Sequence, residues 1–115
     1  MRQKQIIDSK IVGKIFTTWG DYHWRQLIVK KLGPLVKTSI STGCSVKLDF
    51  YIHENRVSAN DIDNLCKPVL DALTDAEVYV DDSCVDNLEA TKIPININDP
   101  EGIHIKIWEW TPEHP

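Results

Sequence analysis

A set of aspartates and one lysine lies within a short stretch of the chain: Asp61, Asp63, Lys67, Asp71, Asp81 and Asp82. Carboxylates gathered at one point repel one another unless a cation neutralises them. Mg²⁺ is the expected cation, because it prefers carboxylate, water and phosphate oxygens; Mn²⁺ is an alternative that the sequence leaves open. A neighbouring lysine can hold a phosphate oxygen or stabilise developing charge. The set therefore suits metal-assisted attack of water on a phosphodiester.

The spacing of these residues favours convergence. Asp61 and Asp63 stand at the start of a predicted helix, on which Lys67 would share a face with Asp63 and Asp71. The aspartate pair in the following turn can be brought back beside the helix start by the chain reversal. Taken singly, each residue has a simpler explanation as a helix cap, a partner for Lys67 or an ordinary turn. Their combination in so short a segment favours a site.

Other common sites do not fit the sequence. A calcium EF-hand loop beginning at Asp61 would need an oxygen ligand at Leu65 and glycine at Cys66. The four histidines are scattered, so they do not suggest zinc. The sequence contains neither the GxxxxGK pattern of a phosphate-binding loop nor the GxSxG pattern of a serine hydrolase.

Hydrophobic periodicity predicts the elements that position this set. The expected order is strand, helix, strand, helix, strand, strand, at residues 11–17, 22–32, 45–53, 61–76, 86–95 and 103–110. Residues 78–85 are expected to form a short extended piece with a polar turn. We expect a small α/β domain spanning residues 1–115, with a mixed sheet packed against two main helices.

Some details of these elements depend on single residues. Asp21 could cap the first helix, and Gly33 with Pro34 should end it. Pro68 leaves two possibilities for the second helix: a regular start near Pro68 after an irregular turn, or a start near Asp63 with a kink. The last two strands are expected to form a hairpin.

Composition limits the class of protein. The 115 residues are 42% hydrophobic and 26% charged, which is ordinary for a globular protein. The chain has no long apolar run, so we expect no membrane span, and its three scattered cysteines favour a reduced, cytoplasmic location. Residues 61–89 carry a net charge of −8, whereas residues 1–56 carry +6. This division fits either balanced surfaces or metal-binding carboxylates beside a phosphate-binding surface.

The segment DIDNLCKPVLDALTDAEVYVDDSCV resembles the signature of the RusA family of Holliday junction resolvases. The matching residues are Asp61-Ile62-Asp63-Asn64-Leu65-Cys66-Lys67, then Asp71-Ala72-Leu73, then Asp81-Asp82. The family's loop after the first strand and its arginines before the first aspartate are not matched, which affects how the chain would grip DNA.

The resemblance implies a homodimeric, Mg²⁺-dependent endodeoxyribonuclease that cuts four-way junction DNA symmetrically, of a kind common in phages and prophages. It assigns catalysis to Asp61, Asp63, Lys67 and Asp82. It assigns the metal to Asp61, Asp63 and Asp82, with Asp81 beside them. The phosphate-contact candidates are Lys10, Lys14, Arg25, Lys30, Lys31, Lys47 and Arg56.

Two other functions stay open. The chain could be a binding module for branched DNA or for a protein partner, with a purely structural acidic cluster. It could also be another phosphotransfer enzyme that uses Asp61 and Asp63. The second is less favoured, because the lead-in Val57-Ser58-Ala59-Asn60 is polar, whereas the nucleophilic aspartate of such enzymes usually ends an apolar strand.

Overall fold

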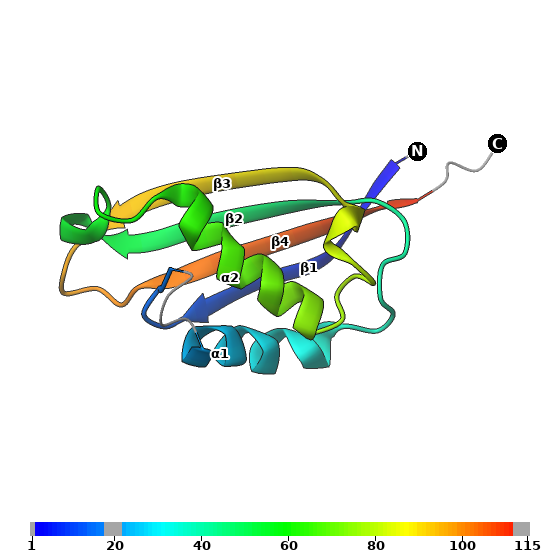
Figure 1. Cartoon of the computed structure of the whole chain (residues 1–115), viewed down its shortest axis with the longest axis horizontal. Helices are drawn as coiled ribbons and strands as arrows, with labels where there is room; N and C mark the ends of the chain where they lie inside the picture. Colours follow the sequence, from blue (N-terminus) through cyan, green and yellow to red (C-terminus); the bar gives the residue numbers. More distant parts are fainter. Residues whose placement is uncertain (1, 18–21, 112–115) are drawn as a thin grey trace.

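The computed structural model describes residues 2–17 and 22–111, which are organised around a mixed four-stranded sheet (Figure 1). The elements follow the predicted order of an α/β domain. They are β1 (Arg2–Val12), α1 (Tyr22–Leu32), β2 (Cys44–His53), α2 (Ile62–Asp75), β3 (Val85–Ile95) and β4 (Gly102–Thr111). Within the described ranges, no helix has the length and apolar character needed to cross a membrane.

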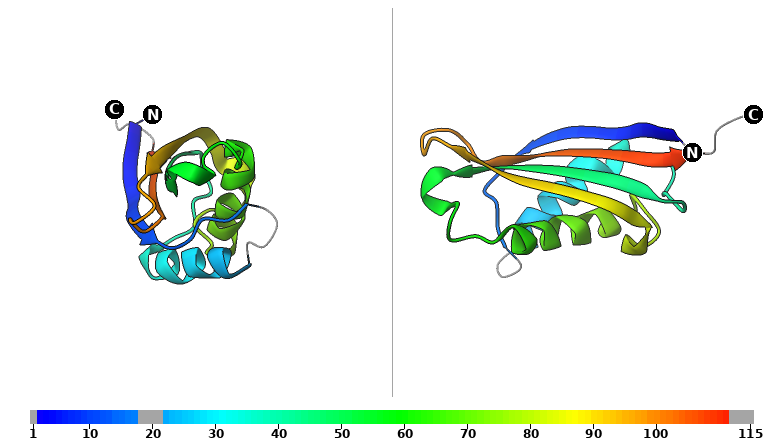
Figure 2. Two further views of the ribbon diagram at one scale, coloured as in Figure 1. Left: turned by 90° about the vertical axis from the view of Figure 1, so that its left-hand side faces the viewer. Right: turned by 90° about the horizontal axis from the view of Figure 1, so that it is seen from above.

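Both helices cover the same face of the sheet, and the core lies between these two layers (Figure 2). Alternate residues of β2, such as Leu48 and Phe50, point into this core and are fully buried. The helix α2 contributes Leu65, Val69 and Leu73 at helical spacing, and these side chains are also fully buried. This packing leaves the polar face of α2 toward solvent.

The first strand differs from the prediction of residues 11–17, because β1 spans Arg2–Val12. β1 is an edge strand that pairs with β4, and among its residues only Ile7 and Ile11 are buried. Ladder hydrogen bonds to β4 can thus hold a largely polar segment as a strand. The chain leaves the sheet at Gly13, whose N–H donates to the Glu101 carbonyl at 2.9 Å.

The predicted hairpin of the last two strands is wrong, because β2 lies between them. The sheet order is β1-β4-β2-β3, with β3 parallel and β4 antiparallel to β2. The helix α2 makes the crossover from β2 to β3 that parallel neighbours require. β2 is the most completely buried strand, and a central position satisfies it better than an edge.

The bounds of α2 show which of the two predicted starts of the second helix is right. It begins at Ile62 and continues to Asp75 with Pro68 inside it, so the start near Asp63 is confirmed and the start near Pro68 is wrong. Pro68 is buried and has no N–H to donate to the preceding turn. Burial of the apolar stripe therefore outweighs the loss of one helical hydrogen bond.

The first helix agrees with the prediction. It spans Tyr22–Leu32 and is followed by a 3₁₀ turn at Gly33–Leu35 that contains Pro34. Its predicted cap, Asp21, lies outside the described residues.

Candidate active site

Asp61 occupies the N-cap position of α2, but its side chain makes no capping hydrogen bond. Its backbone is extended, with φ −69° and ψ 141°, and its carbonyl accepts the first helical hydrogen bond from Leu65 N–H at 3.1 Å. Since the carboxylate is exposed and does not cap the helix, the simple capping explanation fails for Asp61. Its oxygens are available to a ligand.

The polar face of α2 carries Asp63, Lys67 and Asp71 at successive turns. Lys67 Nζ lies 3.2 Å from Asp71 Oδ1, so the predicted pairing of these two residues is confirmed. Both side chains contact solvent, with exposed fractions of 62% for Lys67 and 36% for Asp71. The lysine is thus held loosely by an exposed ion pair and can turn toward a substrate phosphate.

A single β-bridge between Ile40 and Tyr79 holds the chain that leads into the Asp81-Asp82 turn. Ile40 N–H donates to the Val78 carbonyl and Val80 N–H donates to the Ile40 carbonyl, both at 2.9 Å. The chain then enters the 3₁₀ turn Asp82–Cys84, where the Asp81 carboxylate accepts from Ser83 N–H at 3.2 Å. A loop contact far from α2 in sequence therefore fixes where the two aspartates lie.

The turn lies near the middle of α2, because Tyr79, which precedes it, donates its hydroxyl to the Leu70 carbonyl at 2.9 Å. A hydrogen bond with Asp81 and the charge of Asp81 raise the pKa of Asp82; Asp71 raises it further, whereas Lys67 opposes the shift. The pKa of Asp81 is lowered, chiefly because the Asp82 carboxyl donates to it and also because Ser83 N–H does. Negative charge is therefore in excess around Asp82, and a bound cation would relieve it.

The predicted residues thus form two neighbouring groups along α2. The charges of Lys67 and Asp71 reach Asp82 in the turn, whereas Asp61 and Asp63 lie at the helix start. A helix rises about 1.5 Å per residue, so Asp63 and Asp71 are separated by about 12 Å along the axis. Across residues 2–17 and 22–111, no three His, Cys, Asp or Glu side chains are grouped closely enough to hold a metal ion.

The donor set nevertheless fits Mg²⁺. This ion commonly binds one or two carboxylates and completes its shell with water and substrate phosphate, so it does not need three protein ligands. The exposed aspartates supply hard oxygen ligands, and the raised pKa of Asp82 marks a position where positive charge is lacking. Which aspartates bind the metal stays a prediction.

The site is an exposed face and not a small-molecule cavity. Two surface cavities of about 420 and 430 Å³ are lined by other described parts of the chain. Lys14 and Arg56, two phosphate-contact candidates, line the second, and no predicted catalytic or metal-binding residue lines either of them. Small ligands usually bind in concave, mostly apolar pockets. An open row of charged side chains is better suited to a large, charged polymer.

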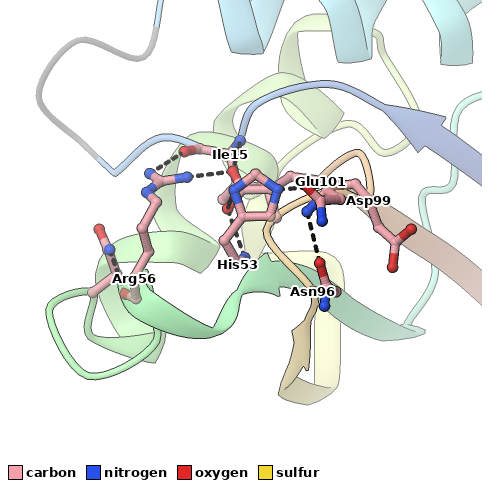
Figure 3. Close-up of polar contacts among 8 residues, drawn as sticks. Ile15, His53, Arg56, Asn96, Asp99 and Glu101 are labelled. Carbon is pink, nitrogen blue, oxygen red and sulfur yellow. Dashed lines mark hydrogen bonds and ion pairs between the residues drawn. The ribbon is translucent and has the colours of Figure 1, made fainter.

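Sequence reasoning missed a buried carboxylate, Glu101, that anchors the loops near the site (Figure 3). Its side chain is 2% exposed and pairs with Arg56, while its oxygens also accept from Ile15 N–H at 3.2 Å and His53 N–H at 2.8 Å. Arg56, a phosphate-contact candidate, is therefore engaged in an ion pair within the fold. The only signal was one acidic residue in a turn-like segment, which pattern reasoning reads as solvent-exposed.

The charge of Glu101 is stabilised despite its burial. Burial raises the pKa of Glu101, but hydrogen bonds from His53, Ile15 and Arg56, with the charge of Arg56, outweigh this effect and lower it. The carboxylate is thus ionised at neutral pH. It joins the segments that follow β1 and β2 to the start of β4.

Comparison with known proteins adds one finding. The model of the family described as endodeoxyribonuclease RusA matches residues 12–108 of the 115-residue chain, a range that includes every predicted catalytic and metal-binding residue. No curated protein matches the chain.

Proposed function

Since the chain belongs to the RusA family of endodeoxyribonucleases, we propose that it is a Mg²⁺-dependent enzyme that resolves four-way DNA junctions by symmetric paired nicks. The observation that carries this proposal is the exposed acidic face of α2, where the Asp81-Asp82 turn returns beside Lys67. It offers carboxylates for a cation and an ammonium for phosphate at one surface. A cytoplasmic location remains part of this proposal.

Asp61, Asp63 and Asp82 are the proposed metal ligands, with Asp81 as a further ligand or hydrogen-bond partner. When bound, Mg²⁺ supplies Lewis-acid chemistry that neutralises the phosphodiester and activates water for attack on phosphorus. These carboxylates would hold the ion near the start of α2, where the Asp61 side chain makes no competing cap bond. Hydrogen bonds from Asp82 and Ser83 lower the pKa of Asp81, which favours its ionised form and suits it to be a further ligand.

Lys67 is the proposed electrostatic catalyst. In the free protein its ammonium group contacts both oxygens of Asp71, at 3.2 and 3.4 Å. A phosphate group entering between the helix and the turn would compete with Asp71 for this cation. Lys67 would then stabilise the charge that develops on the phosphoryl oxygens as the leaving oxygen departs.

Basic residues outside the acidic face are the proposed DNA contacts. Lys30 and Lys31 are exposed in the last turn of α1, which packs beside α2. Arg25 is less suited, because it forms an ion pair with Asp75 at 2.7 Å. Binding should weaken as salt rises, since each neutralised phosphate releases counterions. Symmetric cleavage also requires two active sites, which a homodimer would provide.

Cleavage of a labelled four-way junction in Mg²⁺ tests the proposal, with linear duplex of the same sequence as the comparison substrate. Asp63→Asn should lower cleavage by orders of magnitude and leave folding and junction binding intact. Asp99→Asn is the matched control, because Asp99 lies in the exposed β3–β4 turn and should leave cleavage unchanged.

The same experiment separates the alternatives. Tight junction binding without cleavage, across several sequences and metals, would instead identify a binding module. Hydrolysis of small phosphate esters without action on DNA would indicate another phosphotransfer enzyme.

A further inference from the structure

The short segment between β2 and α2 ends at Asp61, and a lysine on β3 binds two backbone carbonyls of this segment. Lys92 Nζ donates to the Val57 carbonyl at 2.8 Å and to the Asn60 carbonyl at 2.9 Å. Lys92 pairs in register with Phe50, a fully buried core residue, so its side chain projects from the helix-covered face of the sheet. The ammonium group thus lies beneath this segment.

One of these bonds acts directly on the orientation of Asp61. The Asn60 carbonyl and the Asp61 N–H belong to the same planar peptide unit. Fixing the carbonyl oxygen therefore fixes the plane from which the Asp61 Cα departs. Because the Asp61 side chain makes no capping bond, its direction depends on the backbone, which is restrained by this peptide on one side and by the bond from Leu65 N–H on the other.

The other end of the segment is anchored through Arg56. Asn60 Nδ2 donates to the Arg56 carbonyl at 2.7 Å, which closes the turn. The Arg56 guanidinium donates to the Ile15 carbonyl at 2.8 Å and also pairs with the buried Glu101 (Figure 3). The segment is thereby tied to the sheet at both ends, and among the contacts of the described residues it is the link through Lys92 that reaches the peptide containing Asp61 N–H.

The chemistry of Lys92 argues for positioning. Among the described residues it has no carboxylate partner, and two of its three ammonium donors are used on backbone carbonyls. We propose that Lys92 is a positioning residue that orients Asp61 for cation binding. This inference rests on the proposed function, in which Asp61 is a metal ligand.

Lys92→Met tests the inference, because methionine keeps an unbranched side chain and removes the charge and the donors. Lys92→Arg is the conservative variant. Lys106→Met is the matched control, because Lys106 lies on β4 and faces away from the helix-covered side of the sheet. In metal-free protein, the ¹⁵N order parameter of Asp61 should fall from about 0.85 to below about 0.6 in Lys92→Met. The Mg²⁺ concentration for half-maximal cleavage should rise about 10- to 100-fold, as expected for loss of a residue that supports a metal ligand.

Junction affinity in EDTA should stay within about twofold of the wild-type value, because Lys92 holds backbone and not DNA. Lys92→Arg should recover part of both properties, and Lys106→Met should match wild type. If Lys92→Met does not fold, Asn60→Ala removes the bond to Arg56 and should shift the same two measurements in the same direction, by less.

Three results would overturn the inference. An unchanged order parameter and Mg²⁺ midpoint in Lys92→Met, or in Asn60→Ala if that is the variant that folds, would show that the segment needs no such restraint. A large loss of metal-free junction binding would make Lys92 a DNA contact. A wild-type chain that neither binds Mg²⁺ nor cleaves the junction would refute the proposed function and this inference together, whereas the first two results refute the inference alone.

Discussion

Replacement of Glu101 by glutamine should weaken the fold strongly, although the two side chains have almost the same shape. Oε2 of Glu101 accepts from His53 N–H at 2.8 Å, and Oε1 accepts from Ile15 N–H at 3.2 Å and from Arg56. Glutamine keeps one acceptor oxygen and replaces the other with an NH₂ group. One of the two backbone N–H groups then faces a donor in a position that excludes water.

The magnitude follows from the bond that is lost. A hydrogen bond to a charged group contributes about 1.5–3 kcal/mol, and a buried group left without a partner costs about 1–3 kcal/mol. These contributions overlap, and Arg56 is 25% exposed and can regain hydration. We therefore expect the free energy of unfolding at neutral pH to fall by about 2–4 kcal/mol, or roughly 8–16 °C in Tm.

The loss should depend on pH with a definite sign. Because the folded-state pKa of Glu101 lies below the ordinary glutamate value of 4.5, its ionised form stabilises the fold above that value. This contribution disappears as the pH falls through the folded-state pKa. The difference between wild type and Glu101→Gln should therefore be complete near neutral pH and shrink on acidification below the ordinary glutamate pKa.

Urea denaturation followed by tryptophan fluorescence, at neutral and acidic pH, measures this difference. Glu54→Gln is the control, because Glu54 is exposed in the 3₁₀ turn Glu54–Arg56, and it should change stability by less than about 0.5 kcal/mol. The reasoning is refuted if Glu101→Gln is as stable as the control at neutral pH. It is also refuted if the deficit stays constant as the carboxylate is protonated.

Three further changes test other parts of the structure. Asp82→Asn should raise the Tm of the metal-free protein at neutral pH, because the hydrogen bond with Asp81 and the charge of Asp81 raise the pKa of Asp82 and make its ionised form unfavourable. This gain in Tm should vanish in acid. The same variant should lose cleavage activity. Glu77→Gly should stabilise the fold by about 0.5–1 kcal/mol in a thermal melt, because Glu77, two residues after the end of α2, has a φ of 59° that glycine adopts without strain. Gly102→Ala should destabilise the fold by about 1–3 kcal/mol in the same melt, because the new Cβ would lie 2.6 Å from the backbone oxygen of Ile11; an unchanged Tm would show that the two strands can separate freely.

The helix α2 shows which features of the site local sequence patterns can predict. Its apolar stripe and its acidic start are separate signals written in the order of the residues, so the helix, the exposed Asp63 and the Lys67–Asp71 pair could all be predicted. Helical spacing alone sets which of these side chains share a face. The position of the Asp81-Asp82 turn beside Lys67 depends on a contact with Ile40, which no local pattern encodes.

The sequence by itself determined the two helices, three of the four strands, and an acidic segment typical of one nuclease family, because these depend on near neighbours in the chain. Only the tertiary structure decided that the largely polar residues 2–10 belong to an edge strand, and that β2 separates β3 from β4. It also decided that Glu101 and Lys92 lie within the fold. These roles depend on which backbone N–H and C=O groups, distant in sequence, need a hydrogen-bond partner once the layers have packed. Hydrophobic periodicity does not predict which groups those are.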